Sequence, residues 1–116
     1  MRRWLPAVLG AFALAGACAP EIPANSPIFV RQLIERMQAA PVANPPASVW
    51  KYQYQGRTVY YVPPSCCDVP SELYDADGNV LCGPDGGITG TGDGRCPDFF
   101  ETRTGDMRVW QDPRRP

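Results

Sequence analysis

Apolar positions recur at helical spacing between residues 28 and 40, and the charged and amide side chains of this stretch face the other way. This pattern predicts a one-sided amphipathic helix. Ser26 suits the N-cap, Pro27 suits the first helical position, and Pro41 ends the pattern. The apolar stripe consists of Phe29, Val30, Leu33, Ile34 and Met37.

A period of two replaces the helical period in VWKYQYQGRTVYYV, residues 49–62. Gln55-Gly56 divides this run and predicts a two-residue hairpin turn. The turn pairs Tyr54 with Arg57, Tyr52 with Val59, and Trp50 with Tyr61. One side of the hairpin, here called the aromatic face, then carries Trp50, Tyr52, Tyr54, Val59 and Tyr61. The opposite face carries Val49, Lys51, Gln53, Thr58, Tyr60 and Val62.

The aromatic face suits either a stacking surface for sugars or bases, or a core surface beneath the helix. We favour the core, since covering one such ring stabilises a fold by roughly 1.5–3 kcal/mol. This interpretation predicts that Trp50 is mostly buried, with Phe29, Leu33 and Met37 as its neighbours.

The segment from Ser71 to Cys82 predicts a second hairpin, with Gly78 in its turn. A glycine-rich loop follows from residue 83 and ends at Pro97. Residues 101–116 show no periodic pattern and are expected to form a flexible tail. The fold class predicted is a small single α+β domain: one amphipathic helix packed on an antiparallel sheet of two β-hairpins, with a disulfide-bridged glycine-rich loop.

The amino terminus has the layout of a secretory signal peptide, with Arg2 and Arg3 followed by a 13-residue uncharged run from Leu5 to Ala17. That run is too short for a membrane span, which needs about 20 apolar residues. Residues 14–18 also resemble a bacterial lipobox ending in Cys18. Ordinary cleavage at an A-x-A site would break the same bond.

The number of cysteines, five, favours lipidation of Cys18, because the other four can then form two disulfides. We therefore expect a signal peptide over 1–17, a lipidated tether over 18–25, a domain over 26–100 and the tail beyond it. The expected location is the cell envelope, with the chain anchored in the membrane through Cys18. Because Ala19 follows the cysteine, the resemblance to Gram-negative lipoproteins favours the outer membrane, facing the periplasm or the cell surface.

Composition narrows the classes of function. Removing the signal peptide takes away two arginines and no acid, so the formal charge changes from −1 to −3. Without a basic stripe, nucleic acid is not an expected partner. The 14 prolines and 11 glycines imply many turns and loops. There is no histidine, which removes the usual general base and the commonest metal ligand. An enzyme is therefore not expected, although Asp85 and Asp93 are an acid pair that general acid–base chemistry can use.

The four remaining cysteines are Cys66, Cys67, Cys82 and Cys96, and their spacing fits neither a zinc knuckle nor a thioredoxin-like centre. An oxidising compartment favours structural disulfides. Adjacent residues of an extended chain point to opposite sides. We therefore expect Cys66 and Cys67 to take different partners, one Cys82 and the other Cys96. A strained bond between the two adjacent cysteines is the alternative.

The acidic residues near these cysteines raise the question of calcium. The run from Asp75 through Asp77 to Asn79 begins like an EF-hand loop, but Val80 and Gly86 stand where Gly and Glu are required. The alternative is that these acids form turns by bonding their own backbone. The calcium candidates are Asp75, Asp77, Asn79, Asp85 and Asp93. No other cofactor is expected.

The run from Asn44 to Phe99 resembles a domain-of-unknown-function family of small bacterial lipoproteins. The resemblance is carried by Asn-Pro-Pro, a Tyr-rich hairpin, Cys-Cys-Asp, a Tyr-Asp turn and Pro-Asp-Gly-Gly-x-Thr-Gly-x-Gly-Asp-Gly-x-Cys. It supports the lipoprotein interpretation and implies no activity, substrate or catalytic residue. The expected function is a non-enzymatic envelope module with a binding or structural role and an unidentified envelope protein as partner. The alternatives are a calcium-binding secreted module and an enzyme without histidine chemistry.

Overall fold

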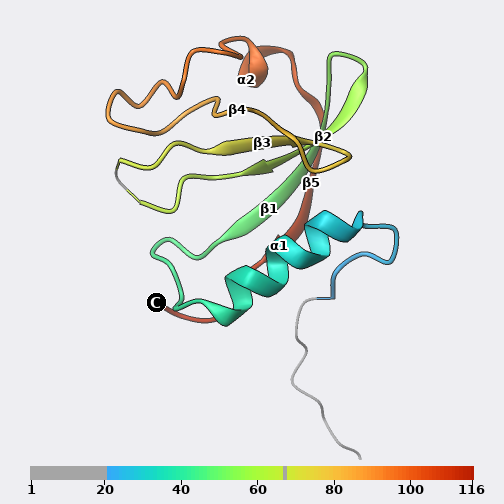
Figure 1. Ribbon diagram of the computed structural model, residues 1–116, viewed down its shortest axis with the longest axis vertical. Coiled ribbons are helices and arrows are strands. Elements are labelled where there is room, and N and C mark those ends of the chain that lie inside the picture. Colours follow the sequence, from blue (N-terminus) through green and yellow to red (C-terminus); the bar gives the residue numbers. More distant parts are fainter. Residues whose placement is uncertain (1–20, 67) are drawn as a thin grey trace, which may run out of the picture.

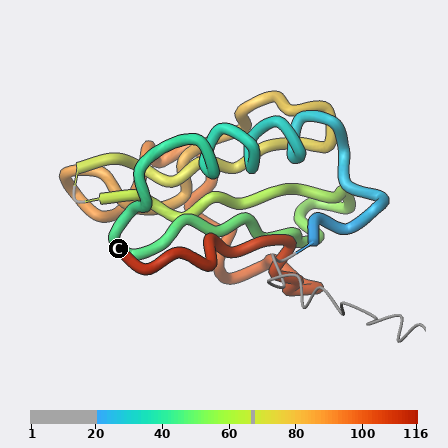
Figure 2. The backbone as a smooth tube through the Cα atoms, turned by 90° about the horizontal axis from the view of Figure 1, so that it is seen from below, coloured from blue at the N-terminus to red at the C-terminus, as the bar shows by residue number. Residues whose placement is uncertain are grey.

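The computed structural model describes residues 21–66 and 68–116 and shows one helix packed on an antiparallel sheet (Figure 1). The strands lie in the order β4-β3-β2-β1-β5. In Figure 2 the helix α1 runs along one side of the strands. The predicted α+β fold class is confirmed. The elements are α1 (Ile28–Ala39), β1 (Ser48–Tyr54), β2 (Arg57–Val62), β3 (Glu72–Asp75), β4 (Val80–Cys82), α2 (Phe99–Thr102) and β5 (Thr104–Gln111).

Both predicted hairpins are confirmed. In the first, β1 and β2 pair Trp50 with Tyr61 and Tyr52 with Val59, which is the register that the turn predicted. Gln55 and Gly56 have φ values of 51° and 75°, as a type I′ turn requires at both central positions. In the second hairpin, β3 and β4 are joined through a turn in which Gly78 has φ 90°.

The helix covers the opposite face of the hairpin, so the prediction that it covers the aromatic face is wrong. Phe29 packs edge-on against Tyr60, with ring centroids 5.5 Å apart, and also contacts Tyr74. Trp50 lies at the margin of the other core, is only partly buried, and donates a hydrogen bond from Nε1 to Ser48 Oγ. The buried residues on the helix side are Val30, Leu33, Ile34, Val49, Tyr60, Val109 and Trp110.

The aromatic face is covered instead by the glycine-rich loop and α2. Phe99, fully buried, contacts the rings of Tyr52, Tyr54 and Tyr61. Two of those tyrosines have hydroxyl groups that need a partner when buried. The hydroxyl of Tyr61 donates to Asp85 of the loop, and that of Tyr54 donates to Asp98, the N-cap of α2. These hydrogen bonds and the ring of Phe99 attach the loop and α2 to the aromatic face.

Residues 104–111 form the edge strand β5, so the prediction of a flexible tail over 101–116 is wrong. β5 pairs with β1 through a register that shifts twice, which removes the strict alternation that reveals strands in a sequence. Its consecutive residues Val109 and Trp110 are both buried on the helix side. Trp110 is 2% exposed and is among the largest fully buried side chains of the described residues.

The amino-terminal end of the domain also extends beyond the predicted boundary. Pro27, not Ser26, is the N-cap of α1. Ile22 packs against the helix-side core, and Arg31 Nη2 donates to the carbonyl oxygens of Pro23 and Ala24. Residues from 22 onward therefore belong to the domain and not to the tether predicted over 18–25.

Candidate functional site

The cysteines of the domain do not pair as predicted. Cys82 is bonded to Cys96, so neither can bond Cys66 or Cys67, and that prediction is wrong. The two Cα atoms lie 6.2 Å apart, within the usual range for a disulfide. Because Cys82 ends β4 and Cys96 precedes α2, the bond joins the glycine-rich loop to the sheet. Cys66 is also disulfide-bonded. Cys18 and Cys67 lie outside the described residues.

The acids of the β3–β4 turn bond their own backbone. Asp75 Oδ1 accepts hydrogen bonds from the amides of Asp77 and Asn79, each at 2.9 Å, and Oδ2 accepts one from Asn79 Nδ2. The bonds from Asn79 are the main reason that the pKa of Asp75 is lowered. The turn-forming interpretation is therefore confirmed for Asp75.

The acids of the glycine-rich loop hold that loop in place. Asp93 accepts the amide protons of Arg95 and Gly83, both at 2.9 Å, and these two bonds lower its pKa. Asp85 accepts the hydroxyl proton of Tyr61 at 2.8 Å. The pKa of Tyr61 is raised by burial and by this bond. Across residues 21–66 and 68–116, no three acidic or cysteine side chains converge as metal ligands. Calcium binding stays an untested alternative to the turn-forming interpretation.

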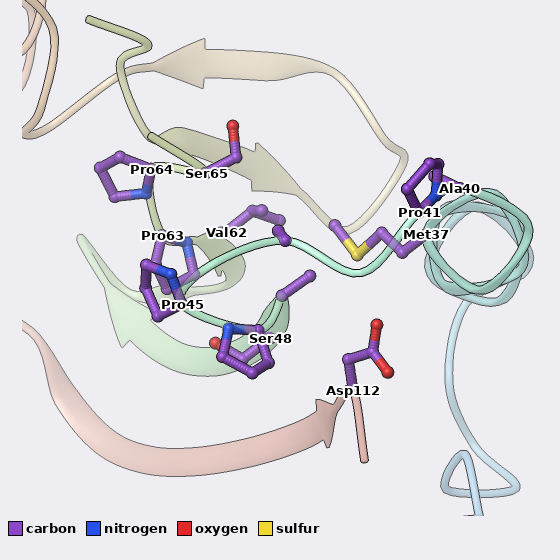
Figure 3. A pocket seen from close by; sticks show the side chains of 13 residues that line it. Met37, Ala40, Pro41, Pro45, Ser48, Val62, Pro63, Pro64, Ser65 and Asp112 are labelled. Atoms are coloured by element: carbon purple, nitrogen blue, oxygen red, sulfur yellow. The ribbon is translucent and has the colours of Figure 1, made fainter. Parts of the chain in front are cut away.

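A pocket of about 290 Å³ opens where the C-terminal end of α1 meets the ends of β1, β2 and β5 (Figure 3). Its wall is mostly apolar and includes five proline rings. Figure 3 shows Met37 and Pro41 on the helix side, with Val62, Pro45, Pro63 and Pro64 across the opening. The lining residues are Met37, Ala40, Pro41, Ala43, Pro45, Pro46, Ala47, Ser48, Val62, Pro63, Pro64, Ser65 and Asp112.

The proline pairs account for the shape of this pocket. Pro41 follows the end of α1, Pro45-Pro46 precedes β1, and Pro63-Pro64 follows β2. A proline ring fixes φ and offers no backbone N–H, so these segments cannot extend the helix or the strands. They leave the sheet at one end and stand apart, and the space between them is the pocket.

Of the described residues that line the pocket, Asp112 alone is charged, and its charge is paired within the fold. Its side chain is 2% exposed and lies 2.7 Å from Arg114 Nη2. The hydrogen bonds from Arg114 lower the pKa of Asp112. Arg114 also donates to the carbonyl oxygens of Met37 and Ala40, which end α1. The chain end therefore packs beside the helix end, as Figure 1 shows, and the pocket carries no net charge.

Two serines are the other polar residues among the described residues that line the pocket. Ser48 Oγ accepts a hydrogen bond from Trp50 Nε1 at 3.1 Å, on the side of the aromatic face. Ser65 is exposed at the rim. The pocket thus combines a rigid apolar wall with a few polar atoms, which is the usual composition of a small-molecule site.

Sequence reasoning identified none of these pocket residues as a site. The segment 41–48 has the composition of a proline-rich connection, and residues near the carboxyl terminus were expected to be flexible. The available signal was the recurrence of proline pairs on both sides of one hairpin, at 45–46 and 63–64. That recurrence brings both pairs to the same end of the sheet.

Comparison with known proteins identifies a family but no activity. The family DUF6970, described as a domain of unknown function, matches residues 35–112. This range ends at Asp112 and so includes all of β5. No curated protein and no solved structure matches the chain. Among the described residues, neither helix has the length and apolar character needed to cross a bilayer.

Proposed function

Since the chain belongs to the DUF6970 family, whose description gives no activity, we propose a role from its own residues. It is a non-enzymatic binding module of the cell envelope, attached to the membrane through a lipid on Cys18. The pocket at the C-terminal end of α1 is its binding site.

The observation that carries this proposal is the apolar pocket itself. A cavity of about 290 Å³ lies close to the lower limit of known ligand sites, and its described lining is mostly apolar, with five prolines. Asp85 and Asp93 of the glycine-rich loop are engaged in structural hydrogen bonds, and so are the hydroxyl groups of Tyr54 and Tyr61 on the hairpin. Together with the lack of histidine, this favours binding over catalysis.

The packed amino-terminal segment adds a consequence for the anchored protein. Because Ile22 already contacts the domain, only residues 19–21 separate it from Cys18. Four extended residue steps, from Cys18 to Ile22, span about 14 Å at most. A lipid on Cys18 would therefore hold the domain against the membrane surface, with little freedom to move away from it.

Metabolic labelling with an alkyne fatty acid in a bacterial host tests the anchoring. The wild-type chain is expected to take up the label, and Cys18→Ala is expected to lose it. Cys66→Ala is the matched control, since it also removes one cysteine but is expected to keep the label. An unlabelled wild type, or label on Cys18→Ala, would contradict the proposed anchor.

A further inference from the structure

We propose that the pocket at the C-terminal end of α1 takes a small neutral aromatic molecule of about one ring with a single polar substituent. This inference rests on the proposed function, because it names the class of ligand for the same site. It follows from the size, the wall chemistry and the charge of the pocket.

Size limits the ligand to a compact molecule. An apolar cavity of about 150 Å³ is enough to bind benzene, and drug-sized ligands occupy about 300–1,000 Å³. At about 290 Å³, the pocket has room for one ring and a short substituent. A long acyl chain would leave most of its length outside.

Proline walls favour the flat face of an aromatic ring. An aromatic ring has a negative face and a positive edge, so the C–H groups of saturated rings pack well against that face. Five prolines line this pocket: Pro41, Pro45, Pro46, Pro63 and Pro64. Proline loses no side-chain entropy when it is buried, so little ordering is required of the walls when a ligand enters.

The charges exclude ionic ligands. Asp112 is already paired with Arg114, so the lining contributed by residues 21–66 and 68–116 contains neither an unpaired cation nor an unpaired anion. A charged ligand would lose hydration and gain no counter-charge. The hydroxyl of Ser65, exposed at the rim, can donate to or accept from one polar atom. A single hydroxyl or carbonyl substituent satisfies this arrangement.

Titration of the purified full chain with a matched set of probes tests the proposal. Phenol is the neutral aromatic probe, benzoate and benzylammonium are the charged ones, and cyclohexanol and decanoate are the non-aromatic ones. Binding is measured by ligand-observed saturation-transfer NMR. Two variants fill the pocket, Ala43→Phe inside it and Ser65→Phe at its exposed rim. Ala76→Phe, at an exposed turn outside the pocket, is the matched control.

Phenol is expected to bind wild type and Ala76→Phe with a dissociation constant of about 1 mM or below. Both filling variants are expected to weaken it by about tenfold or more, and both charged probes should bind at least about tenfold more weakly than phenol. Circular dichroism checks that each variant is folded. If Ala43→Phe does not fold, Ser65→Phe alone decides the test. Probe that partitions into lipid attached to the protein gives the same NMR signal with wild type and with every variant, so it is distinguished from probe bound in the pocket.

Three results would overturn the ligand class. Equal binding of charged and neutral probes, tighter binding of decanoate than phenol, or phenol binding that survives both filling variants each contradicts it. A charged probe or decanoate that the filling variants block would keep the pocket as the site and change only the ligand. Fatty-acid labelling of Cys18 is a separate measurement, so a failed titration does not contradict the proposed lipid anchor.

Discussion

The disulfide between Cys82 and Cys96 should contribute a large part of the stability of the domain. Replacing both residues with alanine opens a loop with a sequence separation of 14. In the chain-entropy account, a closed loop of that length is worth about 3 kcal/mol at 25 °C. For a domain of this size, the loss corresponds to a fall in melting temperature of roughly 12–24 °C. The loop should remain near the sheet, since Tyr61 still donates to Asp85.

Urea unfolding monitored by circular dichroism measures this effect. The double variant is compared with wild type, each with and without reductant. Reductant should lower the stability of wild type by at least as much as the substitutions do. Any remaining effect of reductant on the double variant reports the bond made by Cys66. A loss below about 1 kcal/mol in the double variant would refute the view that this bond contributes a large part of the stability of the domain.

Four further predictions follow from particular side chains. Trp110→Ala should cost about 3–5 kcal/mol in unfolding free energy, and Trp50→Ala, at a partly buried position, less than about 2 kcal/mol. The pKa of Asp112 is lowered in the folded state, so this residue contributes stability above its unfolded pKa of about 3.9 that is lost as pH falls below it. Asp112→Asn should therefore show a weaker fall in unfolding free energy at acid pH than wild type. The hydrogen bond to Asp98 raises the pKa of Tyr54 to about 12. The stability that this bond contributes is therefore present below the unfolded pKa of about 10 and is lost as pH rises towards 12. Tyr54→Phe should lack this alkaline loss of stability in the same assay. Because both oxygens of Asp93 accept backbone protons, millimolar calcium and EDTA should give the same melting curve, and a rise with calcium that Asp93→Asn abolishes would show a metal site.

The first hairpin was predictable because local rules alone determine it. Alternation sets the two faces, and Gln55-Gly56 sets the register, so no distant residue is needed to pair Trp50 with Tyr61. The same holds for the turn around Gly78 and for the stripe of α1. The family resemblance noted in the sequence is likewise confirmed at the level of a domain of unknown function, and its lipoprotein character stays a prediction.

The covers of the two faces were not predictable, because they depend on segments far apart in the chain. Both faces of the hairpin are apolar enough to be buried, and the deciding contacts come from residues after position 80: Asp85, Phe99 and Trp110. β5 escaped prediction because its register shifts and its mostly exposed side chains leave no alternation to detect. The pocket depends in turn on where β5 ends, so the prediction of a flexible tail over 101–116 also prevented its prediction.

Amide chemical-shift mapping of the full chain with phenol tests the central claim, that the pocket at the C-terminal end of α1 is the binding site. The account predicts that the largest shifts lie at the amides of Ala43, Ala47, Val62 and Ser65, with smaller ones at Asp112. The guanidinium of Arg103 lies over the Tyr52 ring of the aromatic face, 4.6 Å from the ring centre. Shifts that gather instead over the aromatic face, around Trp50 and Arg103, would contradict the account and assign binding to the other side of the sheet.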